Sequence, residues 1–462
     1  MGSGIQLEHK LRFYFLYLFV LLAGISGVFG FVSQLWDFPV IKLWKEIYIT
    51  LFFFLVFSNR LIKSGLNNPT NKSVTRFLLI AFIYFILEGF YSISLPIKLI
   101  LYQYKMDVPL LIFFMICWII LAEISEYNLK KISKLYIRIL LSVGILNALA
   151  IILERVFSAP FLRLLGIQGG NWGTTSGVKV ITMGSQIRAI GLLSNFVASG
   201  TLMLMCIIIL IETQTFLDLK NKLVLYTLII LFAVSLFLTT YKTAVMGLIF
   251  YCTLKIIEKF KKKYIIHAFS LFVFFLFFIS THFYSIYYFA SMFNRTMAYN
   301  SIYLRVVQHI SIISQLNTIP KVLFGLGMGR NGIYGINKMG YGINPIATDS
   351  TYIYLVSNYG YLAVLLFLLF GVWIIRLFFL NSEKDVLGAR FLLLYTVCLE
   401  FFYNNFFSDF PTNMFLILLC ILSFFIIQEN RLTEIKLNVF LYLTGLMHKI
   451  AFKKIFILIF SA

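Results

Sequence analysis

Basic side chains recur in two long segments of the chain, 154–189 and 282–350, and each segment holds a single acidic residue, Glu154 and Asp349. Guanidinium groups bind phosphate and pyrophosphate through paired hydrogen bonds. Scattered lysines and arginines are also common as solvated surface groups, so any one of them is weak evidence. As a set they predict a site for a phosphate-bearing ligand, with the candidates Arg155, Arg163, Lys179, Arg188, Arg295, Arg305, Lys321, Arg330 and Lys338.

Three residues are candidates for a general base, which takes a proton from the attacking group in a transfer reaction. Asp349 directly precedes an apolar run, where it could equally cap a helix. His309 follows Arg305 by four residues on the periodic stretch 301–319, so both share one face of a predicted surface helix. A lone histidine there is commonly a plain surface residue. Glu400 lies inside an apolar run, where an ionisable group is costly and therefore a functional candidate.

Further polar residues stand where apolar runs begin or end. Arg188 and Asn195 lie at the start of one run, and Lys242 lies in a short turn between two others. Three polar residues follow Glu400 closely: Tyr403, Asn404 and Asn405. If these runs are membrane helices, such residues lie at helix mouths, where they can meet a ligand at the membrane surface.

A glycine-rich segment, 324–332, contains the pattern G-x-G-x-x-G from Gly327 to Gly332. The pattern is not a dinucleotide site here, because no strand precedes it and no β-α-β unit surrounds it. Glycines do allow backbone N–H groups to line an anion site, and Arg330 lies among them. A tight turn explains the same glycines equally well.

The five cysteines lie in apolar runs and form no C-x-x-C pair. This placement disfavours a disulfide framework and a zinc site, and we expect neither a metal nor a cofactor. The cysteines are Cys117, Cys206, Cys252, Cys398 and Cys420.

The composition indicates which elements must position these candidates. The 462 residues are 61% hydrophobic and 12% charged, against about 25% charged in an average soluble domain, so a soluble fold is excluded. A membrane-spanning helix needs about 20 mostly apolar residues. The sequence therefore predicts an all-α polytopic membrane protein with about twelve transmembrane helices, centred on 13–32, 41–58, 77–95, 108–124, 135–153, 190–211, 223–240, 243–257, 264–281, 351–375, 386–402 and 412–427.

The basic residues also predict the topology, since loops rich in Lys and Arg stay in the cytoplasm. Most of the 39 Lys and Arg residues fall on one side if both termini are cytoplasmic. The segments 154–189 and 282–350 then become extracytoplasmic loops, the second with short amphipathic helices. Residues 1–427 form one transmembrane domain, and the apolar and basic tail 428–462 is predicted to form an interfacial helix. The net charge of +21 then reflects membrane lipids and not nucleic acid.

In this order and topology, several of these pieces resemble the bacterial O-antigen polymerase (Wzy-type) and O-antigen ligase superfamily, which are multi-pass glycosyltransferases of the GT-C type. The resemblance covers roughly residues 185–375. Ligases typically carry His where this chain has Asp349, so the resemblance favours a polymerase. The matching pieces are the stretch Arg188 to Asn195, the turn Thr240 to Ala244 with Lys242 in the usual Arg place, the helix bearing Arg305, the Gly-x-Gly segment 324–330, and Thr348 to Tyr354 followed by Asn358-Tyr359-Gly360.

The resemblance implies a polysaccharide polymerase of the O-antigen or capsule type in the bacterial cytoplasmic (inner) membrane, acting on its periplasmic or outer face. The substrate would be an oligosaccharide on undecaprenyl pyrophosphate. A sugar hydroxyl of one lipid-linked unit would attack the anomeric carbon of the glycan on another, with inversion and without a nucleotide sugar or a metal. A chain-length regulator protein is a further expected partner.

The resemblance also implies roles for the candidate residues. Asp349, or less favourably His309 or Glu400, would take the hydroxyl proton. Developing charge on the leaving pyrophosphate would be stabilised by basic groups. Pyrophosphate and glycan binding would fall to Arg188, Asn195, Lys242, Arg305, Arg330 and Tyr352, with Tyr334 and Tyr341 as further aromatic platforms for sugars.

Two alternatives remain open from the sequence. The nearest is an O-antigen ligase-like enzyme that transfers glycan to a lipid or protein acceptor. The second is a transporter of lipid-linked oligosaccharides, which should carry charges along a central cavity and show two related halves. The chain shows no internal repeat, which favours a transferase.

Overall fold

The chain is almost entirely helical in the computed structural model. Its two short strands, β1 (Thr182–Met183) and β2 (Gln186–Ile187), pair antiparallel. The predicted all-α class is therefore confirmed within the described part of the chain. The structure describes residues 2–36, 39–60, 69–122, 126–158, 182–183, 186–259, 269–275, 305, 307–332, 346, 348–380 and 386–428.

Helices occur in each of the twelve predicted apolar runs, although only 269–275 of the run 264–281 is described. An unlabelled helix, Thr412–Gln428, ends the described chain. Another covers 307–313 in the second long loop. The labelled elements are α1 (Gly2–Gly24), α2 (Ser26–Leu35), η1 (Pro39–Leu43), α3 (Trp44–Arg60), α4 (Pro69–Tyr91), η2 (Ser92–Ser94), α5 (Ile97–Ala122), α6 (Glu126–Val156), α8 (Phe196–Glu212), α9 (Lys222–Leu238), α10 (Lys242–Lys259), α14 (Ile319–Phe324), α16 (Thr351–Leu380), α17 (Ala389–Tyr395), η4 (Thr396–Glu400), α18 (Phe401–Tyr403) and η5 (Phe406–Ser408).

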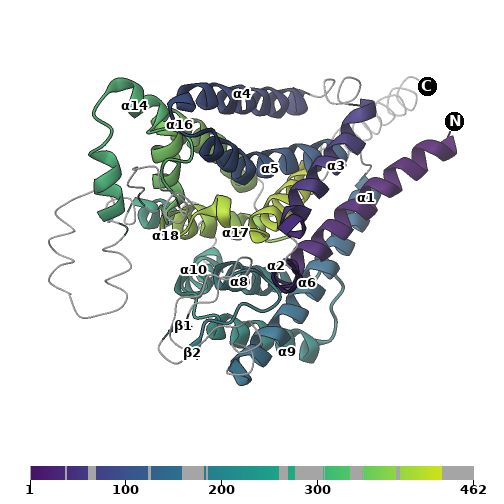
Figure 1. Cartoon of the computed structure of the whole chain (residues 1–462). Coiled ribbons are helices and arrows are strands. Elements are labelled where there is room, and N and C mark those ends of the chain that lie inside the picture. The colour runs from purple at the N-terminus through teal and green to yellow at the C-terminus, as the bar shows by residue number, and fades with distance from the viewer. Residues whose placement is uncertain are drawn as a thin grey trace, which may run out of the picture.

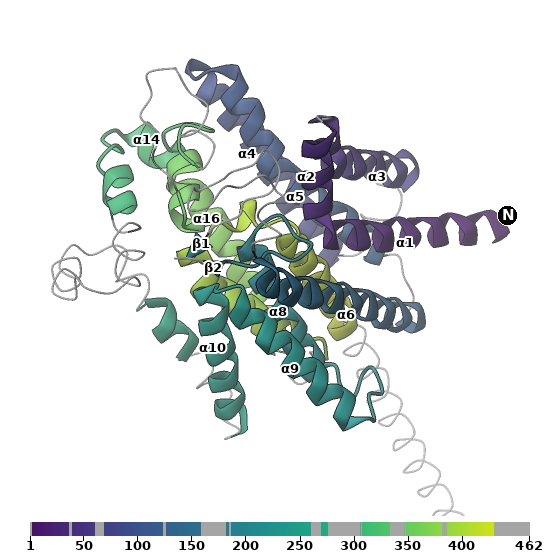
Figure 2. The ribbon, with the colours of Figure 1, turned by 60° about the horizontal axis from the view of Figure 1, so that its bottom comes forward.

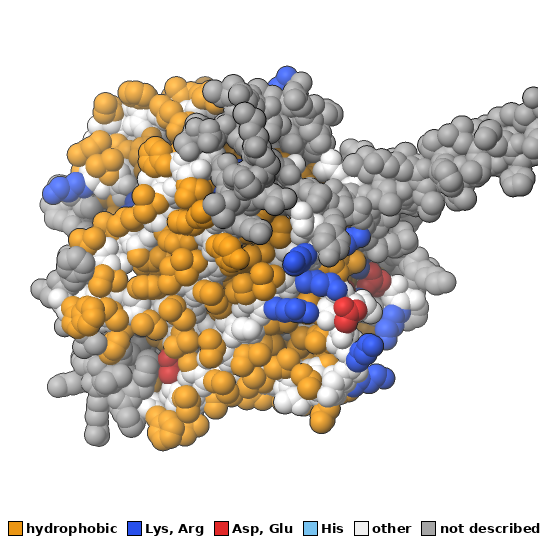
Figure 3. Space-filling view, turned by 90° about the vertical axis from the view of Figure 1, so that its right-hand side faces the viewer, with side chains coloured by type: hydrophobic (Ala, Val, Ile, Leu, Met, Phe, Trp, Pro, Cys, Tyr) orange, Lys and Arg blue, Asp and Glu red, His pale blue; other side chains and the backbone are white. Residues whose placement is uncertain are grey.

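Several helices mark the protein as membrane-embedded. Three of them, Arg76–Ser94, Ile97–Ala122 and Asn128–Val156, are long and apolar enough to cross a membrane. Shorter apolar helices include α8, α9 and the helix Thr412–Gln428. Figure 3 shows a face dominated by hydrophobic side chains, with basic groups gathered toward one end. Such a broad exposed apolar surface is expected where lipid replaces water as the solvent.

Two predicted spans are broken in the structure. The run 13–32 bends by 63° between α1 and α2, where Gly24 packs on Val143 and Gly27 lies against the backbone of Leu193. The run 351–375 is interrupted within α16 at Gly360, which has φ 72° and ψ −178°. A Cβ on Gly360 would lie 2.2 Å from the Leu323 carbonyl oxygen, so only glycine fits this break.

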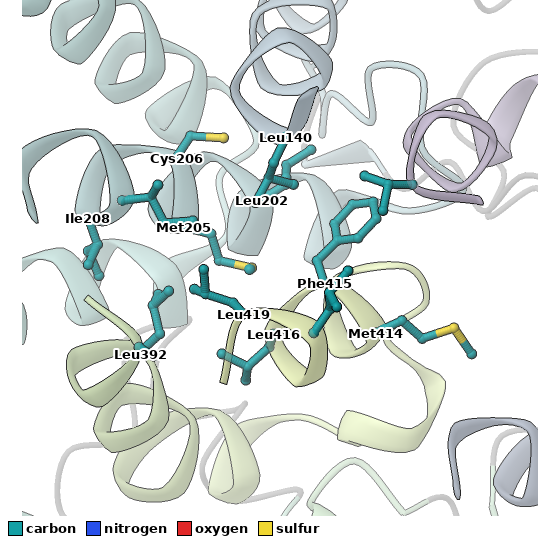
Figure 4. Close-up of a cluster of buried hydrophobic side chains, with 14 of the residues drawn as sticks. Leu140, Leu202, Met205, Cys206, Ile208, Leu392, Met414, Phe415, Leu416 and Leu419 are labelled. Carbon is teal, nitrogen blue, oxygen red and sulfur yellow. The ribbon is translucent and has the colours of Figure 1, made fainter. Parts of the chain in front are cut away.

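The core forms around α8, whose residues Phe196 to Leu210 are nearly all buried. This helix packs on α6, α9 and α10, as Figures 1 and 2 show. In Figure 4, side chains of α8 such as Met205 meet Leu392 of α17 and Leu416 and Leu419 of the last helix. Figure 1 places α17 and α18 between this group and the pair α5 and α16. The segment that follows α17 is therefore central to the molecule.

Candidate functional site

The central feature of this segment is the buried carboxylate of Glu400. An α-helical path would continue from α17, but residues Thr396–Glu400 form a π-helical turn, a departure that is frequent at functional sites. The Tyr241 hydroxyl donates a hydrogen bond of 3.0 Å to Glu400 Oε1, and the Tyr395 hydroxyl donates one to Oε2. The Asn404 side-chain amide donates another, of 3.1 Å, to Oε1.

A second carboxylate, that of Asp409, completes this group. Asp409 lies on the connection between α18 and the helix Thr412–Gln428, is 4% exposed, and is hydrogen-bonded to Glu400. The Asn404 amide also donates to Asp409 Oδ2. Burial and then the negative charge of Glu400 raise the pKa of the Asp409 carboxyl well above its ordinary value. We call Glu400, Asp409, Asn404, Tyr241 and Tyr395 the carboxylate cluster.

A small cavity adjoins the carboxylate cluster. About 10 Å³ of it is open to the centre of a water-sized molecule, which is about enough for one water. Both carboxylates and Tyr395 line it, together with four polar side chains from outside the cluster: Thr201, Thr396, Thr412 and Asn413. The cluster is therefore enclosed, and the cavity itself is too small for a sugar.

Arg305, predicted to bind pyrophosphate, lies beside this cluster. Its guanidinium donates hydrogen bonds from Nη2 (2.6 Å) and Nε (3.2 Å) to the Tyr403 carbonyl oxygen and lies over the Tyr403 ring at 5.5 Å. Burial raises the pKa of the Tyr403 hydroxyl to about 12, while the Arg305 charge lowers it. The predicted surface helix thereby contacts the end of α18, although 98 residues separate the two in sequence.

Asp349, the favoured base, lies two residues before the start of α16. The Gln308 amide donates to Asp349 Oδ2 at 3.3 Å, and the Asp349 backbone N–H donates to Gln308 Oε1 at 3.4 Å. Its side chain is half-buried. The hydroxyls of the next two residues, Ser350 and Thr351, donate to the carbonyls of Phe401 and Asn404.

His309 differs from the surface residue that its helix suggests. It is 1% exposed, and its Nδ1 lies 2.7 Å from the Arg305 carbonyl oxygen. Ile310 and Ile313, two apolar residues of the periodic stretch 301–319, are instead 39% and 38% exposed. The helix 307–313 therefore turns its histidine toward the protein and these two apolar side chains outward, as a helix lying in a membrane surface would.

Arg188 is separated from the cluster by one aromatic ring, that of Phe196. Its guanidinium lies over the Phe196 ring at 4.6 Å, and Phe196 contacts Tyr241 of the cluster with ring centroids 6.0 Å apart. Side chains of α6 fix the backbone around Arg188. Glu154 Oε2 accepts from the N–H groups of Ile190 (2.8 Å) and Gly191 (3.0 Å). Arg188 is thus held on an ordered segment.

Three more predicted binding residues have other surroundings. Asn195 caps α8, since its Oδ1 accepts from the Ala198 N–H at 2.7 Å. Lys242 is exposed at the first residue of α10, next to Tyr241. Tyr352 is 7% exposed, packs on Phe401 and Phe402, and donates to the Val397 carbonyl. Because its ring and hydroxyl are engaged in the core, Tyr352 is not an open platform for a sugar.

The glycine-rich segment forms tight turns instead of an anion site. The N–H groups of Leu326, Met328 and Gly329 donate to Ser357 O, Ser92 Oγ and Asn358 Oδ1, so they are not available to an anion. Gly327 and Gly329 have positive φ and lie against Leu95 and Leu99. Arg330 is accordingly held beside α5 and α16, and contacts of the described residues do not bring it into the carboxylate cluster.

Other basic candidates are used structurally or are not described. Arg155 donates from Nη1 to the Ile187 carbonyl at 2.8 Å, and Lys321 is half-buried and donates to Asn317 Oδ1. The candidates Arg163, Lys179, Arg295, Lys338, Tyr334 and Tyr341 lie outside the described residues, as does the tail 429–462.

Another buried carboxylate, outside the carboxylate cluster and not predicted from the sequence, is Asp107 on α5. It accepts from the hydroxyls of Tyr354 (2.7 and 2.8 Å) and Tyr359 and from the Gln103 amide (2.6 Å). We call these four residues the Asp107 centre. The signal was present, because Asp107 stands within an apolar stretch. Its tyrosine partners are about 250 residues away and could not be paired with it from sequence.

Asp409 was missed for a similar reason, since it stands in a polar turn where an aspartate is unremarkable. Among the described residues, no group of three or more His, Cys, Asp and Glu side chains could hold a metal ion. The site thus consists of the carboxylate cluster with Arg188, Arg305 and Asp349 around it. No protein-family model, curated protein or solved structure matches the chain.

Proposed function

We propose that this chain is a glycan polymerase that transfers an oligosaccharide from undecaprenyl pyrophosphate to a sugar hydroxyl of another lipid-linked unit. The observation that carries the proposal is the convergence of Arg188 and Arg305. They come from two separate predicted outer loops, and each guanidinium lies over an aromatic ring next to the carboxylate cluster. Arg188 lies over Phe196, which contacts Tyr241. Arg305 lies over Tyr403, which directly precedes Asn404. Two guanidinium groups near one site suit a pyrophosphate leaving group.

The chemistry divides among these residues. Asp349 takes the proton from the attacking hydroxyl, because it is the half-exposed carboxylate beside Arg305's helix. Arg188 and Arg305 stabilise charge that develops on the pyrophosphate as the anomeric bond breaks. Glu400 is saturated by hydrogen bonds from Tyr241, Tyr395 and Asn404, so it supports the site and does not act as the base. Neither a metal nor a nucleotide sugar takes part.

The finer membrane arrangement belongs to the same proposal. About twelve spans cross the cytoplasmic membrane of a bacterium, both termini are cytoplasmic, and Arg188, Arg305 and Asp349 face the periplasm or outside. The exposed apolar side chains of the helix 307–313 support this orientation, since they suit a helix resting on the outer surface of a bilayer. Anionic lipid contacts the cytoplasmic side, where the loops are rich in Lys and Arg.

The direct test uses purified protein in lipid nanodiscs with synthetic undecaprenyl-pyrophosphate repeat units and no nucleotide sugar. A ladder of longer glycans is expected. Arg188→Ala should reduce the ladder by about 100-fold or more, as expected for loss of one charge-stabilising group. Lys321→Ala is the matched control, because this half-buried basic residue of the second loop bonds only to Asn317 in the described contacts. Absence of a ladder under every lipid condition would overturn the proposal.

Two alternative functions give different outcomes in the same preparation. A ligase-like transferase would yield product only when a lipid-core or protein acceptor is added. A transporter would move the lipid-linked sugar across a vesicle membrane without forming a glycosidic bond. The polymerase is favoured because the two candidate arginines of the site, Arg188 and Arg305, lie in predicted outer loops, whereas a transporter should distribute its charges along a central path.

A further inference from the structure

The end of α18 joins two parts of the candidate site. A helix leaves its last carbonyl groups without partners in the helix. Asn404 ends α18 by adopting an extended conformation, with φ −148° and ψ 157°. The Tyr403 carbonyl then accepts from Arg305, at 2.6 and 3.2 Å. The Asn404 carbonyl accepts from the backbone N–H (3.0 Å) and hydroxyl (2.8 Å) of Thr351. Two adjacent carbonyls, those of Tyr403 and Asn404, therefore accept hydrogen bonds from Arg305 and from the start of α16.

The Asn404 side chain fixes the orientation of these two carbonyls through its own hydrogen bonds. An amide group carries two N–H donors, and Nδ2 of Asn404 donates to Glu400 Oε1 at 3.1 Å and to Asp409 Oδ2. The acceptors come from both sides of the turn, one before it and one after it. Hydrogen bonds to buried acceptors in a low dielectric are strong and directional, so the turn has one well-defined orientation.

The consequence falls on Arg305 and Asp349. Arg305 is hydrogen-bonded to the Tyr403 carbonyl. Asp349 lies two residues before Thr351, which is hydrogen-bonded to the Asn404 carbonyl. Gln308, one turn after Arg305, bridges the two parts by contacting Asp349. We propose that Asn404 is a positioning residue, which sets the pyrophosphate-binding Arg305 and the base Asp349 at a fixed separation by orienting the end of α18. This inference rests on the proposed polymerase function for the roles of those two residues.

The kinetic test compares Asn404→Ala with Asn405→Ala. Asn405 is the matched control, because it lies on the same turn but its side chain only accepts from the Phe407 N–H. Asn404→Ala should lower kcat by about 100-fold, the effect of an ångström-scale misplacement, with KM changed by less than about threefold. Asn405→Ala should stay within about threefold of wild type in both. A rise in KM without loss of kcat in Asn404→Ala would overturn the proposal.

A second test does not depend on activity. In a variant that carries both Gln308→Cys and Asp349→Cys, at two positions whose native side chains are in contact, a short thiol-to-thiol cross-linker should join the two sites. The linked peptides are detected by mass spectrometry. Adding Asn404→Ala should remove most of the cross-linking, and adding Asn405→Ala should leave it intact. Asp409→Asn replaces one of the two carboxyl oxygens by an amide nitrogen and so weakens the acceptor of the Asn404 amide without changing side-chain size. It should reduce the cross-linking partially, and it serves as a second variant in case Asn404→Ala misfolds.

The outcomes are separable from those of the proposed function. Unchanged cross-linking in Asn404→Ala overturns the positioning role whatever the activity. Equal losses in Asn404→Ala and Asn405→Ala would assign the effect to the whole turn and also overturn it. If cross-linking follows the expected pattern but wild-type protein forms no glycan ladder, Asn404 still orients Arg305 and Asp349, and it is the polymerase function that fails.

Discussion

The carboxylate cluster and the Asp107 centre contact the same short stretch of α16, yet they are built differently. At the Asp107 centre a single carboxylate receives hydrogen bonds from two tyrosines and a glutamine, within a shell of apolar side chains such as Ile100 and Leu355. The carboxylate cluster holds two carboxyl groups, adjoins a small cavity and has Arg188 and Arg305 nearby. The first arrangement satisfies its charge completely and fixes the fold, whereas the second surrounds its charge with groups able to bind a ligand.

From this difference we expect substitutions around the carboxylate cluster to affect activity and those at the Asp107 centre to affect stability. The largest expected effect is that of Asp349→Asn. Removing a general base costs on the order of 100- to 10,000-fold in rate, and asparagine preserves the contact size with Gln308. Glycan-ladder assays should show this loss, while the unfolding temperature in detergent stays at the wild-type value. Normal activity would exclude Asp349 as the base.

Asp107→Ala should show the reverse pattern. The hydroxyls of Tyr354 and Tyr359 would lose their acceptor, while the Gln103 amide would keep the tyrosine hydroxyls as acceptors. Each buried polar group left unpaired costs about 1–3 kcal/mol. We expect the free energy of unfolding to fall by about 3 kcal/mol or more. Tryptophan fluorescence during thermal or denaturant unfolding measures this loss. Asp107→Asn, which keeps one acceptor oxygen, should lose less. Equal stability of wild type and Asp107→Ala would remove the distinction between the two centres.

The pH dependence of stability offers a finer comparison. Because the folded pKa of Asp409 is raised by burial and by Glu400, the folded chain holds a proton that the unfolded chain releases. The stabilisation is complete below the ordinary Asp pKa of about 4 and is lost as pH rises through the raised value. The unfolding temperature of wild type should therefore fall with rising pH relative to Asp409→Asn. Parallel curves for the two proteins would contradict this sign.

The smallest effect is expected for Arg330→Ala. The sequence assigns Arg330 to pyrophosphate, but the glycine segment holds it beside α5 and α16 with its neighbouring N–H groups already bonded. We expect less than about a threefold change in glycan-ladder yield, within the range of ordinary surface substitutions. A loss as large as that of Arg188→Ala would instead include Arg330 in the site and extend the site toward α5.

Local composition was enough to predict helices, because each apolar run satisfies its backbone hydrogen bonds only within itself in a membrane. It also singled out Glu400 and its neighbour Asn404. It could not predict that Tyr241 would contact Glu400 across 159 positions, since no periodicity links them. The bend at Gly24 and Gly27 was equally hidden, because its cause lies in packing on Val143 and Leu193, residues far along the chain.

The break at Gly360 separates two halves of α16 that have different surroundings. The first half, up to Tyr359, is buried and hydrogen-bonded at both of the centres compared above. The second half carries exposed side chains, including Tyr361, Leu365 and Leu369. An unbroken helix behaves as a stiff rod, which would transmit a tilt of its second half to Asp349. Because the hydrogen-bond ladder is interrupted at Gly360, we expect the second half to tilt with less displacement of Asp349.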